Sequence, residues 1–147
     1  EEKEKLVVVL SSLNKLNKRV IVSIHPRTRN ALKRYGLFEY EFSNITFNDP
    51  QSYFRNLGYL YYSEGLITDS GGMQKEAYWL QKKCVTVRKE TEWVETLNKD
   101  ANRLVFNDLS GINKIFADSN SEYDIILYGN GNTSKEIVQT CLKFLDK

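Results

Sequence analysis

The sequence predicts an α/β protein in which a parallel β-sheet is covered by helices on both faces. Apolar runs of about four or five residues alternate with longer segments of helical period along the chain. The run Val20-Ile21-Val22-Ser23-Ile24 is almost continuously apolar, which is typical of a strand buried on both sides. Neighbouring parallel strands need helical crossovers between them, so this alternation favours βαβ units over hairpins.

The first elements follow from spacing and from residues that end regular structure. Leucines repeat at helical intervals from Leu6 to Leu16, which predicts a surface helix over residues 2–18. The strand at 20–24 is expected to stop at Pro26, which cannot donate to a ladder. A helix is expected over 27–35, with Gly36 suited to its C-terminal cap.

The rest of the chain continues the same alternation. Pro50 suits the first turn of a helix, and residues 91–95 are expected to start a short helix with Thr91 as a candidate N-cap. A loop is expected over 128–132. The remaining strands are expected at 45–47, 65–68, 84–87 and 102–106, and the remaining helices at 52–60, 73–80, 109–118 and 134–145.

Length and composition indicate one globular domain. The 147 residues are 41% hydrophobic and 27% charged, which excludes a disordered, collagen-like or coiled-coil chain. The formal net charge of +2 gives no reason to expect nucleic acid or an anionic membrane as a partner. No apolar run approaches the ~20 residues that span a bilayer. The chain starts with a charged run, so we expect no signal peptide. It also starts without Met, so we expect it to be an excised piece of a longer cytoplasmic protein.

The two cysteines, Cys84 and Cys141, are too few for a disulfide framework and lack metal-ligand spacing. We therefore expect two reduced, buried thiols. A metal site is not expected, because the chain has a single histidine without ligands at suitable spacing.

The stretch Asp69-Ser70-Gly71-Gly72-Met73-Gln74-Lys75-Glu76 is the most informative. Glycines between a strand and a helix let the backbone approach a ligand, and the helix start offers N–H donors for phosphate. Glu76 is suited to accept hydrogen bonds from a ribose diol. The alternative is a plain helix cap, with Glu76 as a first-turn partner of the dipole. The pattern is neither a dinucleotide fingerprint nor a P-loop.

A second polar cluster follows the first strand. His25 lies at the strand end, and Arg27 and Arg29 after it are available for anionic groups. The alternative for His25 is a solvated loop residue. Aromatic residues crowd the segment before the glycine motif, where one could stack on a base or all could pack a helix. These are Tyr53, Phe54, Tyr59, Tyr61 and Tyr62.

Four ordered stretches resemble the C-terminal domain of the non-hydrolysing UDP-N-acetylglucosamine 2-epimerases. They are His25-Pro26-Arg27-Thr28, Asp69-Ser70-Gly71-Gly72-Met73-Gln74-Lys75-Glu76-Ala77, Arg88-Lys89-Glu90-Thr91-Glu92-Trp93-Val94-Glu95 and Tyr128-Gly129-Asn130-Gly131. The resemblance implies a Rossmann-like three-layer αβα sandwich, the C-terminal half of a GT-B-type epimerase. Residues 1–147 would then be a single UDP-sugar-binding domain, whose partner is its own N-terminal catalytic half.

The resemblance also implies site roles and chemistry. Ser70, Gly71 and Gly72 would bind the diphosphate and Glu76 the ribose, while His25 and Arg27 would lie near the sugar nucleotide or the family's effector site. The family's isomerase reaction eliminates UDP and adds it back, which inverts carbon 2 of the sugar without a cofactor or metal. Its proton-transfer carboxylates belong to the N-terminal half, so no catalytic residue is expected here. The parent would be a homodimer in cell-surface polysaccharide biosynthesis.

Two departures from the family pattern leave the substrate open. Many members have Thr-Glu-Arg-Pro-Glu where this chain has Thr91-Glu92-Trp93-Val94-Glu95, a form that resembles the branch acting on UDP-2,3-diacetamido-2,3-dideoxy-glucuronic acid. The position that often carries a base-stacking Phe aligns with Asn56, and Tyr53 or Phe54 could replace it. The rival hypotheses are a GT-B glycosyltransferase domain and a non-enzymatic sugar-nucleotide-binding module.

Overall fold

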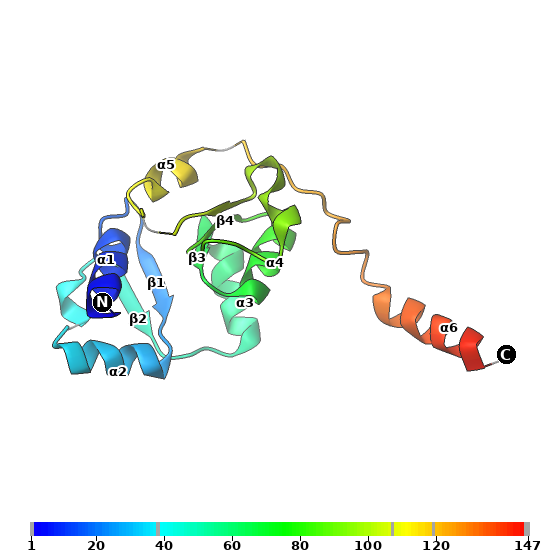
Figure 1. Ribbon diagram of the computed structural model, residues 1–147, viewed down its shortest axis with the longest axis horizontal. Helices are drawn as coiled ribbons and strands as arrows, with labels where there is room; N and C mark the ends of the chain where they lie inside the picture. The colour runs from blue at the N-terminus through cyan, green and yellow to red at the C-terminus, as the bar shows by residue number, and fades with distance from the viewer. Residues whose placement is uncertain (1, 38, 107, 119, 146–147) are drawn as a thin grey trace.

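A computed structural model describes residues 2–37, 39–106, 108–118 and 120–145 (Figure 1). The strands are β1 (Val20–Ser23), β2 (Ile45–Asn48), β3 (Gly65–Thr68), β4 (Lys83–Thr86) and β5 (Asn102–Leu104). The helices are α1 (Glu2–Asn14), α2 (Pro26–Tyr35), α3 (Tyr53–Tyr62), α4 (Gly71–Trp79), α5 (Ile112–Ala117) and α6 (Thr133–Leu145), with 3₁₀ segments η1 (Glu39–Glu41) and η2 (Val94–Asp100).

All described strand pairs are parallel, as the alternation predicts. β1 pairs with β2, and β3, β4 and β5 pair in that order, so the backbone hydrogen bonds form two ladders. The two ladders share apolar packing, because Val9, Leu16 and Ile67 contact the buried clusters of both.

Strand β4 shows that helices cover both faces. Its residues are buried throughout, and successive side chains of a strand point to opposite faces. Cys84 packs with residues of α3 and α4, whereas its neighbour Val85 packs with residues of α5. The expected layering of helix, sheet and helix is therefore confirmed around β4.

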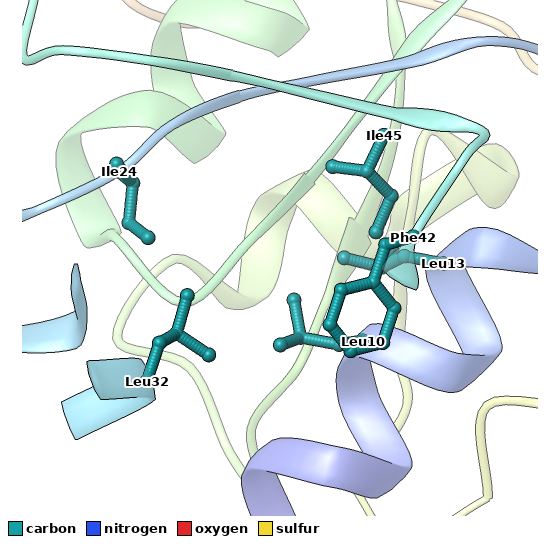
Figure 2. Packing of buried hydrophobic residues seen from close by; sticks show 6 residues of the cluster. All are labelled: Leu10, Leu13, Ile24, Leu32, Phe42 and Ile45. Carbon is teal, nitrogen blue, oxygen red and sulfur yellow. The ribbon is translucent and has the colours of Figure 1, made fainter. Parts of the chain in front are cut away.

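A second part of the core lies under β1 and β2. Figure 2 shows Leu10 and Leu13 of α1 and Leu32 of α2 facing Ile24, Phe42 and Ile45. Gly36 ends α2 as predicted, in the left-handed conformation with a φ of 67°. Its N–H donates to the carbonyls of Leu32 and Lys33.

Several boundaries differ from prediction, because contacts distant in sequence decide them. α1 ends at Asn14, not at residue 18. The side chain of Asn44 donates to the carbonyls of Leu16 and Lys18, which holds this segment in a turn. Pro50 precedes α3 instead of lying in its first turn, since Ser52 occupies the N-cap position.

A short helix starts within residues 91–95 as predicted, but the predicted N-cap at Thr91 is wrong, because Trp93 occupies that position. The Thr91 hydroxyl accepts from the Trp93 N–H at 3.1 Å and donates to Gln74 Oε1 at 2.6 Å, and η2 begins only at Val94. The prediction that both thiols are buried is also wrong for one of them. Both cysteines are free, but Cys141 is exposed on α6 while Cys84 is buried.

The C-terminal helix α6 projects away from the body (Figure 1), and none of its described residues is buried. The segment before it contacts the body, because the Asp124 N–H donates to Tyr78 Oη at 2.9 Å and Tyr128 Oη donates to Glu95 at 3.0 Å. Among the described residues, no helix is both long enough and apolar enough to cross a membrane.

Candidate functional site

The candidate site lies at the start of α4, directly after β3. The helix begins at Gly71, two residues earlier than predicted, so both glycines belong to its first turn. Ser70 occupies the N-cap position in an extended conformation, yet its hydroxyl makes no capping hydrogen bond. The first N–H groups of a helix have no acceptor within it. Because the Ser70 hydroxyl does not cap the helix, this hydroxyl and the first N–H groups of α4 remain as donors for an anion.

The two glycines have different reasons to be glycine. A Cβ on Gly71 would overlap the Glu92 carboxylate and lie 3.1 Å from Trp93 Nε1. A Cβ on Gly72 would meet nothing within 4 Å. Internal packing therefore explains Gly71, whereas the space beside Gly72 is open to a ligand.

Glu76 lies in the second turn of α4, so the helix-cap alternative does not describe it. Dipole stabilisation falls off after the first turn, and α4 has no acidic residue there. Across the described chain, nothing forms a hydrogen bond or ion pair with the Glu76 carboxylate. The half-buried carboxylate is thus available to a ligand.

His25 and Arg27 lie at the start of α2, after β1. His25 caps this helix, because its Nδ1 accepts from the Arg27 N–H at 3.2 Å. The proton of the neutral ring is therefore on Nε2, which can donate outward. Arg27 is exposed and pairs with no group in the described residues. No hydrogen bond or ion pair of the described chain joins these two residues to the α4 site.

Arg29 is not available for anions as the sequence predicted. Its guanidinium binds Glu39 at 2.9 Å and also Asp49, and these hydrogen bonds raise its pKa. Asn56 is likewise engaged, since it accepts a hydrogen bond from Ser23 Oγ at 3.1 Å. The alternative stacking residues Tyr53 and Phe54 are 58% and 82% exposed.

A buried polar network fixes the loop that covers the start of α4. Gln74, which is fully buried, accepts from Thr91 Oγ1 at 2.6 Å and from Asn102 Nδ2 at 3.2 Å. Asn102 also donates to Thr96 Oγ1 at 3.0 Å and accepts from Thr86 Oγ1 at 2.8 Å. These bonds join α4, β4, β5, η2 and the segment before η2, so the site has a rigid support.

Two cations also lie beside the start of α4. Arg88 forms an ion pair with Glu92 at 2.9 Å, and Lys75 Nζ lies 3.8 Å from the centroid of the Trp93 ring. A hydrogen bond from its own backbone N–H is the largest cause that lowers the pKa of Glu92, and the charge of Arg88 adds to it. Sequence reasoning assigned no role to Gln74 or Lys75. The buried position of Gln74 could have been found, because it lies one turn from Ala77 and Tyr78 on the same helix face.

Known proteins are similar to this chain in sequence and in fold. A family model described as UDP-N-acetylglucosamine 2-epimerase matches residues 1–142. The chain belongs to this family. It is 37% identical over 143 residues to a UDP-N-acetylglucosamine 2-epimerase homolog of Methanococcus maripaludis, covering 93% of this chain and 40% of that protein. It is 35% identical over 150 residues to the UDP-2,3-diacetamido-2,3-dideoxy-D-glucuronate 2-epimerase of Pseudomonas aeruginosa, covering 95% and 40%.

A solved structure of the epimerase family has the same fold. The UDP-GlcNAc 2-epimerase of Methanocaldococcus jannaschii, in complex with UDP-GlcNAc and UDP, superposes with a TM-score of 0.81 at 32% identity. The match covers 97% of this chain and 41% of that one. The Rossmann-like α/β fold expected from the resemblance, of the kind found in GT-B-type epimerases, is thereby confirmed. The chain spans about 40% of the length of the epimerases that it matches.

Proposed function

We propose that this chain is the UDP-sugar-binding half of a UDP-N-acetylglucosamine 2-epimerase, which interconverts UDP-GlcNAc and UDP-ManNAc. The observation that carries this proposal is the start of α4. Ser70 makes no capping hydrogen bond and Gly72 is open, while Glu76 in the second turn has no partner among the described residues. Arg88 and Lys75 lie beside the start of this helix. The family match supports an epimerase over a glycosyltransferase domain or a non-enzymatic module.

Each group has a physical role in this proposal. Ser70 and the N–H groups of Gly71 and Gly72 bind the diphosphate, and Glu76 accepts hydrogen bonds from the ribose diol. His25 and Arg27 contact the sugar nucleotide from the start of α2. Elimination of UDP places negative charge on the departing diphosphate, and fixed N–H donors at a helix start stabilise such charge.

The proposal assigns proton transfer to the other half of the parent epimerase. A chain of these 147 residues is therefore expected to bind UDP with millimolar or high-micromolar affinity and to convert no UDP-GlcNAc, because elimination needs a base. Calorimetry measures the affinity, and NMR of the anomeric protons detects any turnover. Sub-micromolar binding or conversion of substrate would contradict the assignment of a half-site.

A second substrate has support from one position. By the resemblance of this segment to the family pattern, Trp93 stands where many members have arginine. The chain is also 35% identical to an epimerase of UDP-2,3-diacetamido-2,3-dideoxy-D-glucuronate. We propose this glucuronate as the alternative substrate of the parent. Assays of the parent with each UDP-sugar separate the two.

The binding roles can be tested by two substitutions with matched controls. Glu76→Ala removes charge-assisted hydrogen bonds to the ribose and weakens UDP binding by roughly 1.5–3 kcal/mol. The UDP affinity of the parent therefore falls about 10- to 150-fold. Ser70→Ala weakens UDP binding but spares uridine, because Ser70 addresses phosphate only. Ser52→Ala is the control for serine, since Ser52 also occupies an N-cap position without a capping bond. Glu136→Ala, in α6, is the control for the carboxylate.

The melting temperature decides between binding and structural roles. If Ser70→Ala and Glu76→Ala keep full UDP affinity but melt at lower temperature, the motif is only a helix start and the proposal fails.

A further inference from the structure

One buried polar group of the site has no partner. Across the described residues, Trp93 Nε1 is the one buried side-chain nitrogen or oxygen without a hydrogen bond. A buried donor that lacks an acceptor is costly and calls for an explanation. This nitrogen lies beside the first turn of α4, 3.1 Å from the position that a Cβ on Gly71 would take.

The unpaired N–H cannot be attributed to a loosely placed side chain, because Trp93 is held at several points. Its backbone N–H donates to Thr91 Oγ1 at 3.1 Å, and its carbonyl accepts from Thr96 Oγ1 at 2.7 Å. Lys75 Nζ lies over its ring. Thr91 is in turn fixed by Gln74. The indole is therefore preorganised, with its one polar atom directed at the start of α4.

The carboxylate of Glu92 occupies the space over Gly71. An anion there matches the positive end of the helix. This carboxylate is weakly held, however, because the Glu92 side chain is 48% exposed, and its partners are its own backbone N–H and a partly exposed Arg88. Exposed ion pairs of this kind contribute little stability, so another anion can displace this carboxylate.

We infer that the indole N–H of Trp93 donates to a diphosphate oxygen of the bound nucleotide, in the space that Glu92 fills when no ligand is present. This inference rests on the proposed diphosphate site and adds a binding residue and an internal competitor to it. The ligand displaces the Glu92 carboxylate, satisfies the indole and leaves Arg88 free to face the same charge. Binding of any diphosphate ester thus exchanges one anion for another at the start of α4.

The first experiment observes the indole directly. Trp79→Phe removes the other tryptophan, which is 56% exposed near the end of α4, and leaves Trp93 as the sole indole. In ¹⁵N–¹H spectra of this variant, UDP and inorganic pyrophosphate shift the Trp93 indole resonance, whereas uridine leaves it in place. A stationary indole resonance while UDP shifts backbone resonances would overturn the inference alone. No shift anywhere with UDP would overturn the proposed function as well.

The second experiment uses substitutions with opposite expected effects. Trp93→Phe keeps an aromatic ring but lacks the N–H, so UDP affinity falls about 10- to 100-fold while uridine affinity stays. The melting temperature of the ligand-free variant is unchanged or raised, since an unpaired buried donor is gone. Glu92→Gln removes the competing charge and tightens UDP binding about two- to five-fold. Unchanged UDP affinity in Trp93→Phe, or weaker UDP binding in Glu92→Gln, would contradict the exchange.

Discussion

The buried amide of Gln74 offers the sharpest test of how the site is supported. Gln74→Leu keeps a similar volume but removes the acceptor of Thr91 and one of two acceptors of Asn102. The Thr91 hydroxyl then has no acceptor among its described contacts, whereas Asn102 keeps Thr96. One unsatisfied buried hydroxyl costs about 1–3 kcal/mol, and the loss of a second, longer bond adds about 1 kcal/mol.

We therefore expect Gln74→Leu to lower the free energy of unfolding by about 2–4 kcal/mol. In a domain of this size that corresponds to roughly 5–15 °C in melting temperature. Urea denaturation measures the change as a lower midpoint with an unchanged slope. Gln139→Leu, on the exposed face of α6, makes the same chemical change without a buried partner and is the control.

A double-mutant cycle with Thr91→Val decides whether the bond itself carries the effect. The two substitutions remove the same hydrogen bond, so their effects should fall short of additivity by about 1–2 kcal/mol. The network would be refuted as the support of the loop if Gln74→Leu changed the free energy of unfolding by less than about 0.5 kcal/mol, or if the effects of the two substitutions were strictly additive.

Three further predictions concern packing, ligand access and pH. A Cβ on Gly65 would lie 2.7 Å from the carbonyl oxygen of Lys83, so Gly65→Ala should destabilise the domain by about 1–3 kcal/mol in urea denaturation; an unchanged midpoint would contradict this. Gly72→Ala should leave ligand-free stability unchanged or raise it by up to about 1 kcal/mol, yet weaken UDP binding. An unchanged UDP affinity would show that the ligand does not occupy the space beside Gly72. The pKa of Asp100 is held below its ordinary value of 3.8, first by a hydrogen bond from Arg103 and then by one from Lys83. The ionised Asp100 therefore stabilises the folded state above pH 3.8, and this contribution is lost as pH falls further. Asp100→Asn should flatten the fall in melting temperature below that pH, and an unchanged profile would count against it.

Local sequence determined most of the regular structure. The order of helices and parallel strands follows from hydrophobic period, which depends on residues within one or two turns of each other. The cap at Gly36 was predictable for the same reason, because a left-handed residue after a helix favours glycine whatever surrounds it. The glycine motif could also be placed between a strand and a helix.

The candidate site was only partly predictable from local sequence. Ser70, Gly72 and Glu76 could be proposed as ligand-binding residues, since they lie in one short segment of the sequence. Whether they were free to bind a ligand was not predictable. That depended on Ser70 making no cap and on Glu76 lying beyond the first turn, because α4 begins two residues earlier than its apolar pattern indicates.

Only the tertiary structure decided which side chains are already engaged. Arg29 resembles a ligand-binding residue in sequence, but Glu39 and Asp49, 10 and 20 residues away, occupy it. Thr91 resembles a helix cap and its hydroxyl accepts from the Trp93 N–H, but the helix begins only at Val94. The same hydroxyl donates to Gln74, 17 residues earlier, which fixes Thr91 in the buried network. The physical reason is that a polar side chain binds the best partner within about 3 Å, and folding brings such partners together from distant positions. The unpaired indole of Trp93 could likewise be recognised only once the packing around it was known.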